Sequence, residues 1–116
     1  MFVKLLKSKI HRARVTAVKL DYPGSIEIDA DLMHACDLLP YESVLVADLN
    51  NGSRLETYVV PGEAGSRRIV ALGAAARLIN PGDRIIVLNF AYFTLEEAKK
   101  HKAKVIVLDE SNNIIS

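Results

Sequence analysis

Residues 20–29, Leu-Asp-Tyr-Pro-Gly-Ser-Ile-Glu-Ile-Asp, place a Pro-Gly-Ser core between two segments in which apolar and polar residues alternate. Alternation with period two is typical of strands. Proline suits the second position of a type II turn, and glycine suits the third, where φ is positive. The simplest interpretation of residues 23–25 is therefore a hairpin-like bend between two extended segments.

The same tripeptide also permits the chain to react with itself. The hydroxyl of Ser25 can reach the carbonyl carbon of Gly24 by closing a small ring. Glycine also tolerates strained conformations that other residues cannot adopt. Attack on that carbonyl would convert the amide into an ester, and β-elimination would leave dehydroalanine at residue 25. Its hydrolysis would give a pyruvoyl ketone, which condenses with amines and withdraws electrons as pyridoxal phosphate does.

Length and composition indicate one small cytoplasmic domain. The chain has 116 residues, half of them hydrophobic, and a net charge of +1. The low charge argues against nucleic acid as a partner, and the apolar runs are too short to span a membrane. The N-terminus does not resemble a secretory signal. The single cysteine, Cys36, excludes an internal disulfide and is expected to be a small buried hydrophobe. So much apolar residue on a small domain also predicts an oligomer.

The pattern along the chain predicts many short strands and a few short helices. Strands are predicted over 3–9, 13–21, 43–48, 54–60, 68–72, 84–90 and 104–108, with an extended segment at 26–28. Helices are predicted over 30–39, 74–78 and 94–100. Asp29 or Asp31 can cap the first helix, and the spacing of Thr94 and Glu97 predicts a capping box at the start of the last. Asn50-Asn51-Gly52 predicts a hairpin, residues 61–66 a loop, and residues from Asn112 onward a tail. This arrangement favours a mainly β fold closed into a barrel.

Strand periodicity also assigns side chains to faces. In the first strand, Lys7, Lys9, His11 and Ala13 are expected to share one face. Leu20 is expected to turn inward, and Leu39 to lie on the apolar stripe of the helix over 30–39. In the strand over 54–60, Arg54, Glu56 and Tyr58 are predicted on one face and Leu55, Thr57 and Val59 on the other. The strand over 84–90 is the most apolar and is predicted to be central.

A set of short motifs occurs in one order and register. They are Lys9 and His11 within residues 7–13, then Tyr22-Pro23-Gly24-Ser25-Ile26, Ile28-Asp29-Ala30-Asp31-Leu32, Asn51-Gly52-Ser53-Arg54, Thr57-Tyr58 and Gly73-Ala74-Ala75-Ala76. No single motif is specific, but the set resembles the pyruvoyl-dependent aspartate 1-decarboxylase family from about Leu6 to Leu108.

The resemblance implies a fold, an activity and an assembly. The fold is a six-stranded double-psi β-barrel with short helices. The chain would cleave itself between Gly24 and Ser25 into a β chain (1–24) and an α chain (25–116) whose Ser25 becomes a covalently bound pyruvoyl group. The enzyme would convert L-aspartate to β-alanine and CO₂ for pantothenate and coenzyme A biosynthesis. Members of the family are homotetramers with sites between neighbouring subunits, and some need a separate maturation factor.

The resemblance also assigns roles to particular residues. Thr57 would polarise the Gly24 carbonyl during cleavage and contact substrate afterwards, and Tyr58 would donate a proton. The other implied substrate-binding residues are Lys9, Arg54, Gly73, Ala74 and Ala75, with His11 and Tyr22 as possible site-lining residues. Taken alone, Lys9 and Arg54 are ordinary surface cations and Tyr58 an ordinary strand tyrosine. No metal site is predicted, because no cluster of ligands has suitable spacing.

Two positions depart from the family pattern. Leu72 stands where the family commonly has Asn, so an amide near the site is missing. Pro23 removes a backbone N–H and fixes φ just before the scissile residue, which would either strain the bond or hinder its cleavage. These departures leave alternatives: an unprocessed, non-catalytic β-barrel that binds an acidic protein or nucleic acid through its basic N-terminal strand, or an unprocessed structural subunit.

Overall fold

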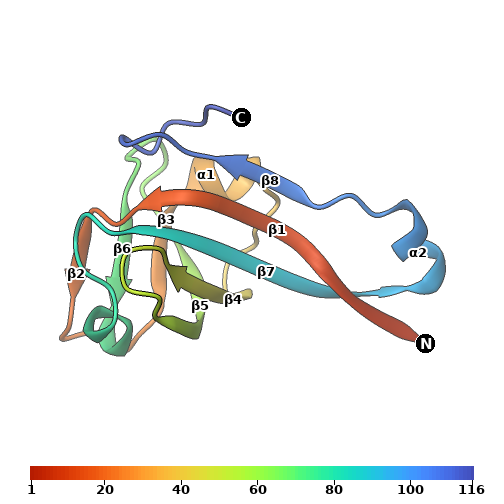
Figure 1. Ribbon diagram of the computed structural model, residues 1–116, viewed down its shortest axis with the longest axis horizontal. Helices are drawn as coiled ribbons and strands as arrows, with labels where there is room; N and C mark the ends of the chain where they lie inside the picture. The colour runs from red at the N-terminus through yellow and green to blue at the C-terminus, as the bar shows by residue number, and fades with distance from the viewer.

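A computed structural model describes residues 1–116 and shows a mainly β protein (Figure 1). Eight strands form one sheet in the order β2-β6-β3-β5-β4-β7-β1-β8. The strands are β1 (Phe2–Arg14), β2 (Ala17–Lys19), β3 (Ile26–Asp29), β4 (Ser43–Asp48), β5 (Arg54–Gly62), β6 (Ile69–Leu72), β7 (Arg84–Thr94) and β8 (Lys104–Val107). The helices are α1 (Ala30–Ala35), the 3₁₀ helix η1 (Gly73–Arg77) and α2 (Leu95–Lys100).

The sheet bends round a core of 20 buried residues. β5 joins its two parts, because its first half pairs with β4 and its second half pairs with β3. β2 lies at one end of the strand order, yet it follows β1, near the other end, after only two residues. β7 pairs with both β1 and β4, which confirms its predicted central position. No helix has the length and apolar character needed to cross a membrane.

The predicted break after residue 9 is wrong, because β1 is one strand with two irregularities. The register against β7 shifts between Leu6 and Ser8 and again between Ile10 and Ala13, where Arg12 has a φ of 65°. Each shift inverts the side-chain alternation that follows it. Ala13 is consequently fully buried, and Lys7 turns to Glu42, with 2.8 Å between Nζ and Oε1. The four residues expected to share one face therefore do not.

The helix predicted over 30–39 ends at Ala35. Of the two predicted caps, Asp29 is the one used: it accepts a hydrogen bond from the amide of Asp31 at 2.8 Å. Asp37 adopts a φ of 58°, a left-handed conformation that commonly terminates helices. The predicted position of Leu39 is thus wrong, and its side chain is exposed. Cys36 is fully buried, as predicted, and burial raises the pKa of its thiol to about 11.

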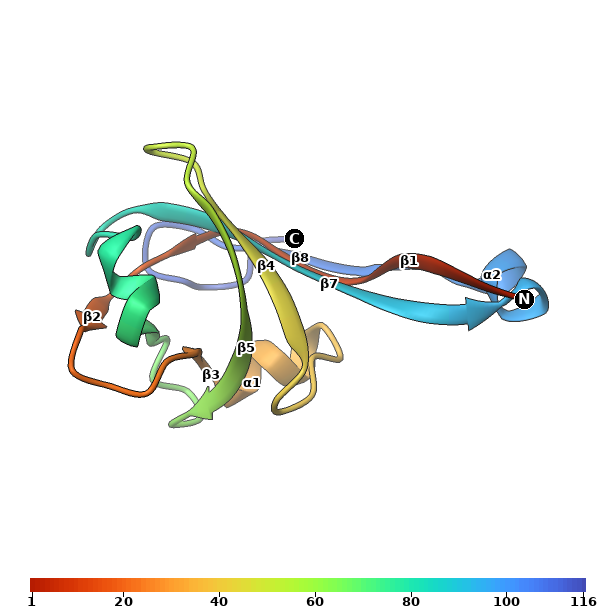
Figure 2. The ribbon, with the colours of Figure 1, turned by 90° about the horizontal axis from the view of Figure 1, so that it is seen from below.

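Three further boundaries differ from the prediction. β5 continues through the predicted loop to Gly62 because residues 59–62 pair with β3. β7 extends to Thr94, and Figure 2 shows the paired ends of β1 and β7 projecting from the sheet, with α2 at the tip. The capping box of α2 is confirmed between Thr94 and Glu97. Leu20 is exposed because β2 ends at Lys19.

The predicted C-terminal tail is instead tied to the domain by Asn112. This residue is 1% exposed, with a φ of 61°. Its Oδ1 accepts from the amide of Arg14 at 2.7 Å, and its Nδ2 donates to the carbonyls of Arg14 at 2.9 Å and Arg67 at 3.0 Å. One side chain thereby joins the end of β1, the segment before β6 and the C-terminal segment.

Asn112→Ala is expected to destabilise the protein by about 2–4 kcal/mol, because three hydrogen bonds are lost and buried backbone groups are left unpaired. Urea denaturation at fixed protein concentration measures the loss. Asn113→Ala is the matched control, since Asn113 is exposed and its Oδ1 accepts only a long contact of 3.4 Å from Arg67 Nε. Equal midpoints for the two variants would contradict this role for Asn112.

Candidate active site

The backbone at residues 24 and 25 has an unusual conformation. Gly24 has a φ of 127°, and Ser25, an L-residue with a side chain, has a φ of 98°. Positive φ is costly for a residue other than glycine and needs support from its surroundings. Part of that support is visible: Ser25 is 3% exposed, and its carbonyl accepts a hydrogen bond from the amide of Leu72 at 3.0 Å.

The segment around Gly24 links two strands, but it is not the turn of a hairpin. β2 and β3 do not pair with each other; both pair with β6, β2 in parallel and β3 antiparallel. The predicted hairpin-like bend is therefore wrong, although the positive φ expected at Gly24 is present. β3 runs parallel to β5, with Ile26 opposite Val59. Residues 23–25 consequently lie along the edge of β5 near Thr57.

A pocket of about 200 Å³ opens between these segments. It is lined by Pro23, Gly24, Ser25, Leu55, Glu56, Thr57, Leu72, Ala74, Ala75 and Leu78. Seven of the residues singled out from the sequence thus meet here: Pro23, Gly24, Ser25, Thr57, Leu72, Ala74 and Ala75. Leu55 and Leu78 were not singled out. Leu55 was predicted on the same face as Thr57, which is the signal that could have found it, whereas no motif marks Leu78.

Thr57 and Tyr58 point to opposite sides of β5. The register between β4 and β5 is uninterrupted from Ser43–Tyr58 to Ala47–Arg54, so no bulge interrupts the alternation of side chains. Arg54, Glu56 and Tyr58 are exposed, and Val59 is fully buried. The predicted assignment of faces in this strand is confirmed. We call the side that carries Arg54, Glu56 and Tyr58 the outer face of the sheet.

Lys9 lies on the same outer face, three strands away. Cross-strand partners share a face, and the register gives the row Lys9, Leu88, Leu45, Glu56 across β1, β7, β4 and β5. Strand spacing separates the backbones of Lys9 and Glu56 by roughly 14 Å. None of the four ion pairs in the chain involves Lys9 or Arg54. Both cations are therefore available to an anionic ligand.

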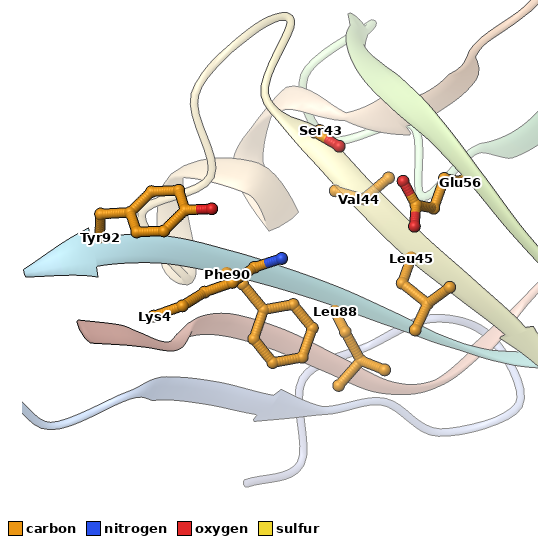
Figure 3. A pocket seen from close by; sticks show the side chains of 8 residues that line it. All are labelled: Lys4, Ser43, Val44, Leu45, Glu56, Leu88, Phe90 and Tyr92. Carbon is orange, nitrogen blue, oxygen red and sulfur yellow. The ribbon is translucent and has the colours of Figure 1, made fainter. Parts of the chain in front are cut away.

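A hollow of about 340 Å³ lies in this outer face (Figure 3). Leu45, Leu88 and Phe90 form its apolar floor, and Lys4 and Glu56 contribute opposite charges. Figure 3 shows Glu56 on β5 facing the hollow and Tyr92 on β7 at its other end. Phe90 is 41% exposed and Tyr92 71%, so a large apolar surface remains uncovered in the single chain.

His11 follows Lys9 in β1 and is partly buried. Its Nδ1 is buried and has no hydrogen-bond partner. Burial, together with the charges of Lys9, Arg12 and Arg84, lowers the pKa of His11 below its ordinary value. The imidazole is therefore neutral at neutral pH and can accept or donate one hydrogen bond at the orphaned nitrogen.

The remaining candidate residues do not line the pocket that contains Ser25. Gly73 is buried and Tyr22 is 54% exposed, and neither residue lines the pocket. Lys9, Arg54 and Tyr58 do not line it either. Within one chain, the bond predicted to break and the cations predicted to hold substrate thus belong to different sides of the sheet.

Comparison with known proteins identifies the family. The family described as "Aspartate decarboxylase" matches residues 1–115. The aspartate 1-decarboxylase of Acetivibrio thermocellus is 56% identical over 116 residues, covering 100% of this chain and 92% of that protein. Those of Moorella thermoacetica and Listeria welshimeri are 56% and 50% identical, covering 95% and 98% of this chain and 86% and 90% of theirs. With this agreement over its whole length, the chain belongs to the aspartate decarboxylase family.

Proposed function

We propose that this protein decarboxylates L-aspartate to β-alanine and CO₂, and so supplies pantothenate and coenzyme A biosynthesis in the cytoplasm. The observation that carries the proposal is the buried Ser25, with a φ of 98°, placed after Gly24 in a pocket that also contains Thr57. Because the chain belongs to the aspartate decarboxylase family, we interpret this arrangement as the site of self-cleavage. We also propose that the chain folds as a six-stranded double-psi β-barrel.

The first reaction is self-cleavage into 1–24 and 25–116. The Oγ of Ser25 attacks the carbonyl carbon of Gly24, the C–N bond breaks, and the nitrogen gains a proton, so that an ester joins the two residues. Loss of the Ser25 α-proton then expels the Gly24 carboxylate, which keeps the serine oxygen. One water hydrolyses the resulting dehydroalanine, and ammonia and the pyruvoyl ketone are formed. Thr57, which lines the same pocket, is proposed to donate a hydrogen bond to the Gly24 carbonyl.

The pyruvoyl group would accept the electrons that the broken bond leaves on the α-carbon of the substrate, which side chains do poorly. The chain's own residues bind and orient the substrate. Arg54 is proposed to hold the retained side-chain carboxylate, because a cation paired with the departing carboxylate would stabilise the ground state and slow the loss of CO₂. Lys9 supplies a second positive charge. Tyr58 is proposed to donate a proton from its Oη to the α-carbon after CO₂ leaves.

These roles require two copies of the chain. Ser25 and Thr57 line the pocket, whereas Lys9, Arg54 and Tyr58 lie on the outer face. We propose that the outer face of one subunit covers the pocket of its neighbour in a homotetramer. The exposed apolar residues of the outer face support this assembly, because large apolar patches commonly mark interfaces.

Mass spectrometry of purified protein, with and without phenylhydrazine, tests the proposal. Wild-type protein is expected to give two fragments cut between Gly24 and Ser25, with the hydrazone on the larger one, and to release CO₂ from L-aspartate. Ser25→Ala is expected to remain intact and inactive. Because Leu72 makes the pocket wall apolar where the family commonly has an amide, the experiment includes an arm with a maturation factor from a relative. A chain that stays uncut in both arms would overturn the proposal.

A further inference from the structure

We infer that Gly73 is a positioning residue for self-cleavage: its missing side chain lets the backbone of residues 71–73 pack directly against the scissile segment and hold it in its strained conformation. The inference rests on the proposed function, since it concerns the cleavage between Gly24 and Ser25. It assigns to Gly73 a task that precedes, and is separate from, any contact with substrate.

The packing at Gly73 leaves no room for a methyl group. A Cβ built there would lie 2.6 Å from the carbonyl oxygen of Tyr22 and 2.8 Å from both the Cα and the nitrogen of Gly24. All three atoms belong to backbone, so none can swing aside as the tip of a flexible side chain would. A side chain at residue 73 would therefore displace residues 22–24 themselves.

Gly24, on the other side of this contact, has no such steric restriction. A Cβ on Gly24 would meet nothing within 4 Å, so residue 24 needs glycine for its φ of 127° alone. Gly73 combines a positive φ of 66° with a steric requirement set by Gly24 and Tyr22. The scissile segment is thus pressed against Gly73 on one side and open on the other.

A second contact fixes the same junction. The amide of Leu72 donates to the carbonyl of Ser25 at 3.0 Å, and Ala71 pairs with Ile26. Together these contacts hold the residues on both sides of the Gly24–Ser25 bond against the end of β6. The geometry of the attacked carbonyl is therefore set by backbone packing, which is rigid, rather than by side chains.

The test is the rate of cleavage in Gly73→Ala, followed by intact mass in freshly prepared precursor. The rate is expected to fall at least about tenfold, because a small shift between nucleophile and carbonyl removes the near-attack geometry. Gly82→Ala is the matched control: Gly82 also has a positive φ, 89°, but its Cβ would meet only the tip of the Arg14 side chain at 4.0 Å. Gly82→Ala is expected to cleave at the wild-type rate despite a similar loss in thermal stability.

Hydroxylamine identifies the blocked step, which a general loss of stability would not do. It cleaves an ester at residues 24–25 but leaves the amide intact. Under mild conditions that spare the Asn51–Gly52 bond, hydroxylamine is expected not to cut Gly73→Ala chains between residues 24 and 25, because the initial attack is what the displacement prevents. Accumulation of a hydroxylamine-sensitive ester would overturn the inference, since the attack would then have occurred normally.

A further variant covers the case in which Gly73→Ala does not fold. Pro23→Gly frees the chain before Gly24, so that residues 22–24 can yield to the added methyl group. Gly73→Ala in this background is expected to fold and still cleave slowly compared with Pro23→Gly alone. Cleavage of Gly73→Ala at its parent's rate would refute the inference and leave the proposed function standing. A wild-type chain that stays uncut with and without the maturation factor would instead overturn the proposed function.

Discussion

Co-expression of Ser25→Ala and Arg54→Ala chains is expected to restore activity well above that of either variant alone. A Ser25→Ala tetramer has an intact outer face but no pyruvoyl group. An Arg54→Ala tetramer has a processed pocket but lacks the proposed carboxylate clamp. If each site joins the pocket of one subunit to the outer face of the next, about a quarter of the sites in randomly mixed tetramers combine the two intact halves.

The reason lies in the alternation of β5. Thr57 faces the pocket and Tyr58 faces the other way, with an uninterrupted register against β4 that leaves no bulge to bring them together. Within a single chain, the alternation therefore directs Arg54 to the side of β5 opposite to Thr57. A second copy can supply the missing half without any rearrangement.

Steady-state decarboxylation by the co-expressed, purified mixture provides the measurement. Separately purified tetramers, mixed without subunit exchange, should give no such increase and show that assembly is needed. Lys9→Ala with Arg54→Ala is the matched pair, because both changes affect the outer face and every mixed site then lacks one cation. Restored activity in that pair, or none in the first, would show that the sites are not divided as proposed.

The sequence predicted the elements whose pattern is local. The alternation in residues 54–60 assigned both faces of β5 correctly, and the Thr94–Glu97 spacing gave the capping box. The shifts in β1 could not be predicted, because neither glycine nor proline marks them. Asn112 was missed because its partners, Arg14 and Arg67, are 98 and 45 residues away. A side chain that pairs with distant backbone leaves no periodic trace in its own neighbourhood.

In the candidate site, too, the sequence predicted local features but not those that depend on residues distant in the chain. Gly24 and Ser25 stand out in the sequence because turn chemistry and the resemblance both point to them. The steric role of Gly73 does not, because it depends on which backbone atoms lie within 3 Å of the position that a Cβ would take. Likewise, the sequence placed Lys9 on one face of an extended strand, but only the row through Leu88 and Leu45 places Lys9 and Glu56 on the same side of the sheet.

Arg54→Ala is expected to lower kcat/KM for L-aspartate by roughly 10²–10⁴, because two charge-assisted hydrogen bonds to a carboxylate are worth about 1.5–3 kcal/mol each. Arg54 is exposed at the start of β5 and has no ion-pair partner in its own chain. Loss of its side chain therefore leaves no buried charge uncompensated. The effect should appear in catalysis and not in folding, and intact mass should still show complete cleavage.

Arg54→Lys distinguishes the two carboxylates of the substrate. Lysine keeps the charge but loses the bidentate geometry. If Arg54 holds the retained carboxylate, the variant should discriminate less well between aspartate and asparagine, whose side chain is neutral. The comparison of kcat/KM for both substrates measures this, with Arg14→Lys at the end of β1 as the arginine control. Unchanged selectivity with a lower rate would place Arg54 at the departing carboxylate, where ground-state pairing opposes the loss of CO₂.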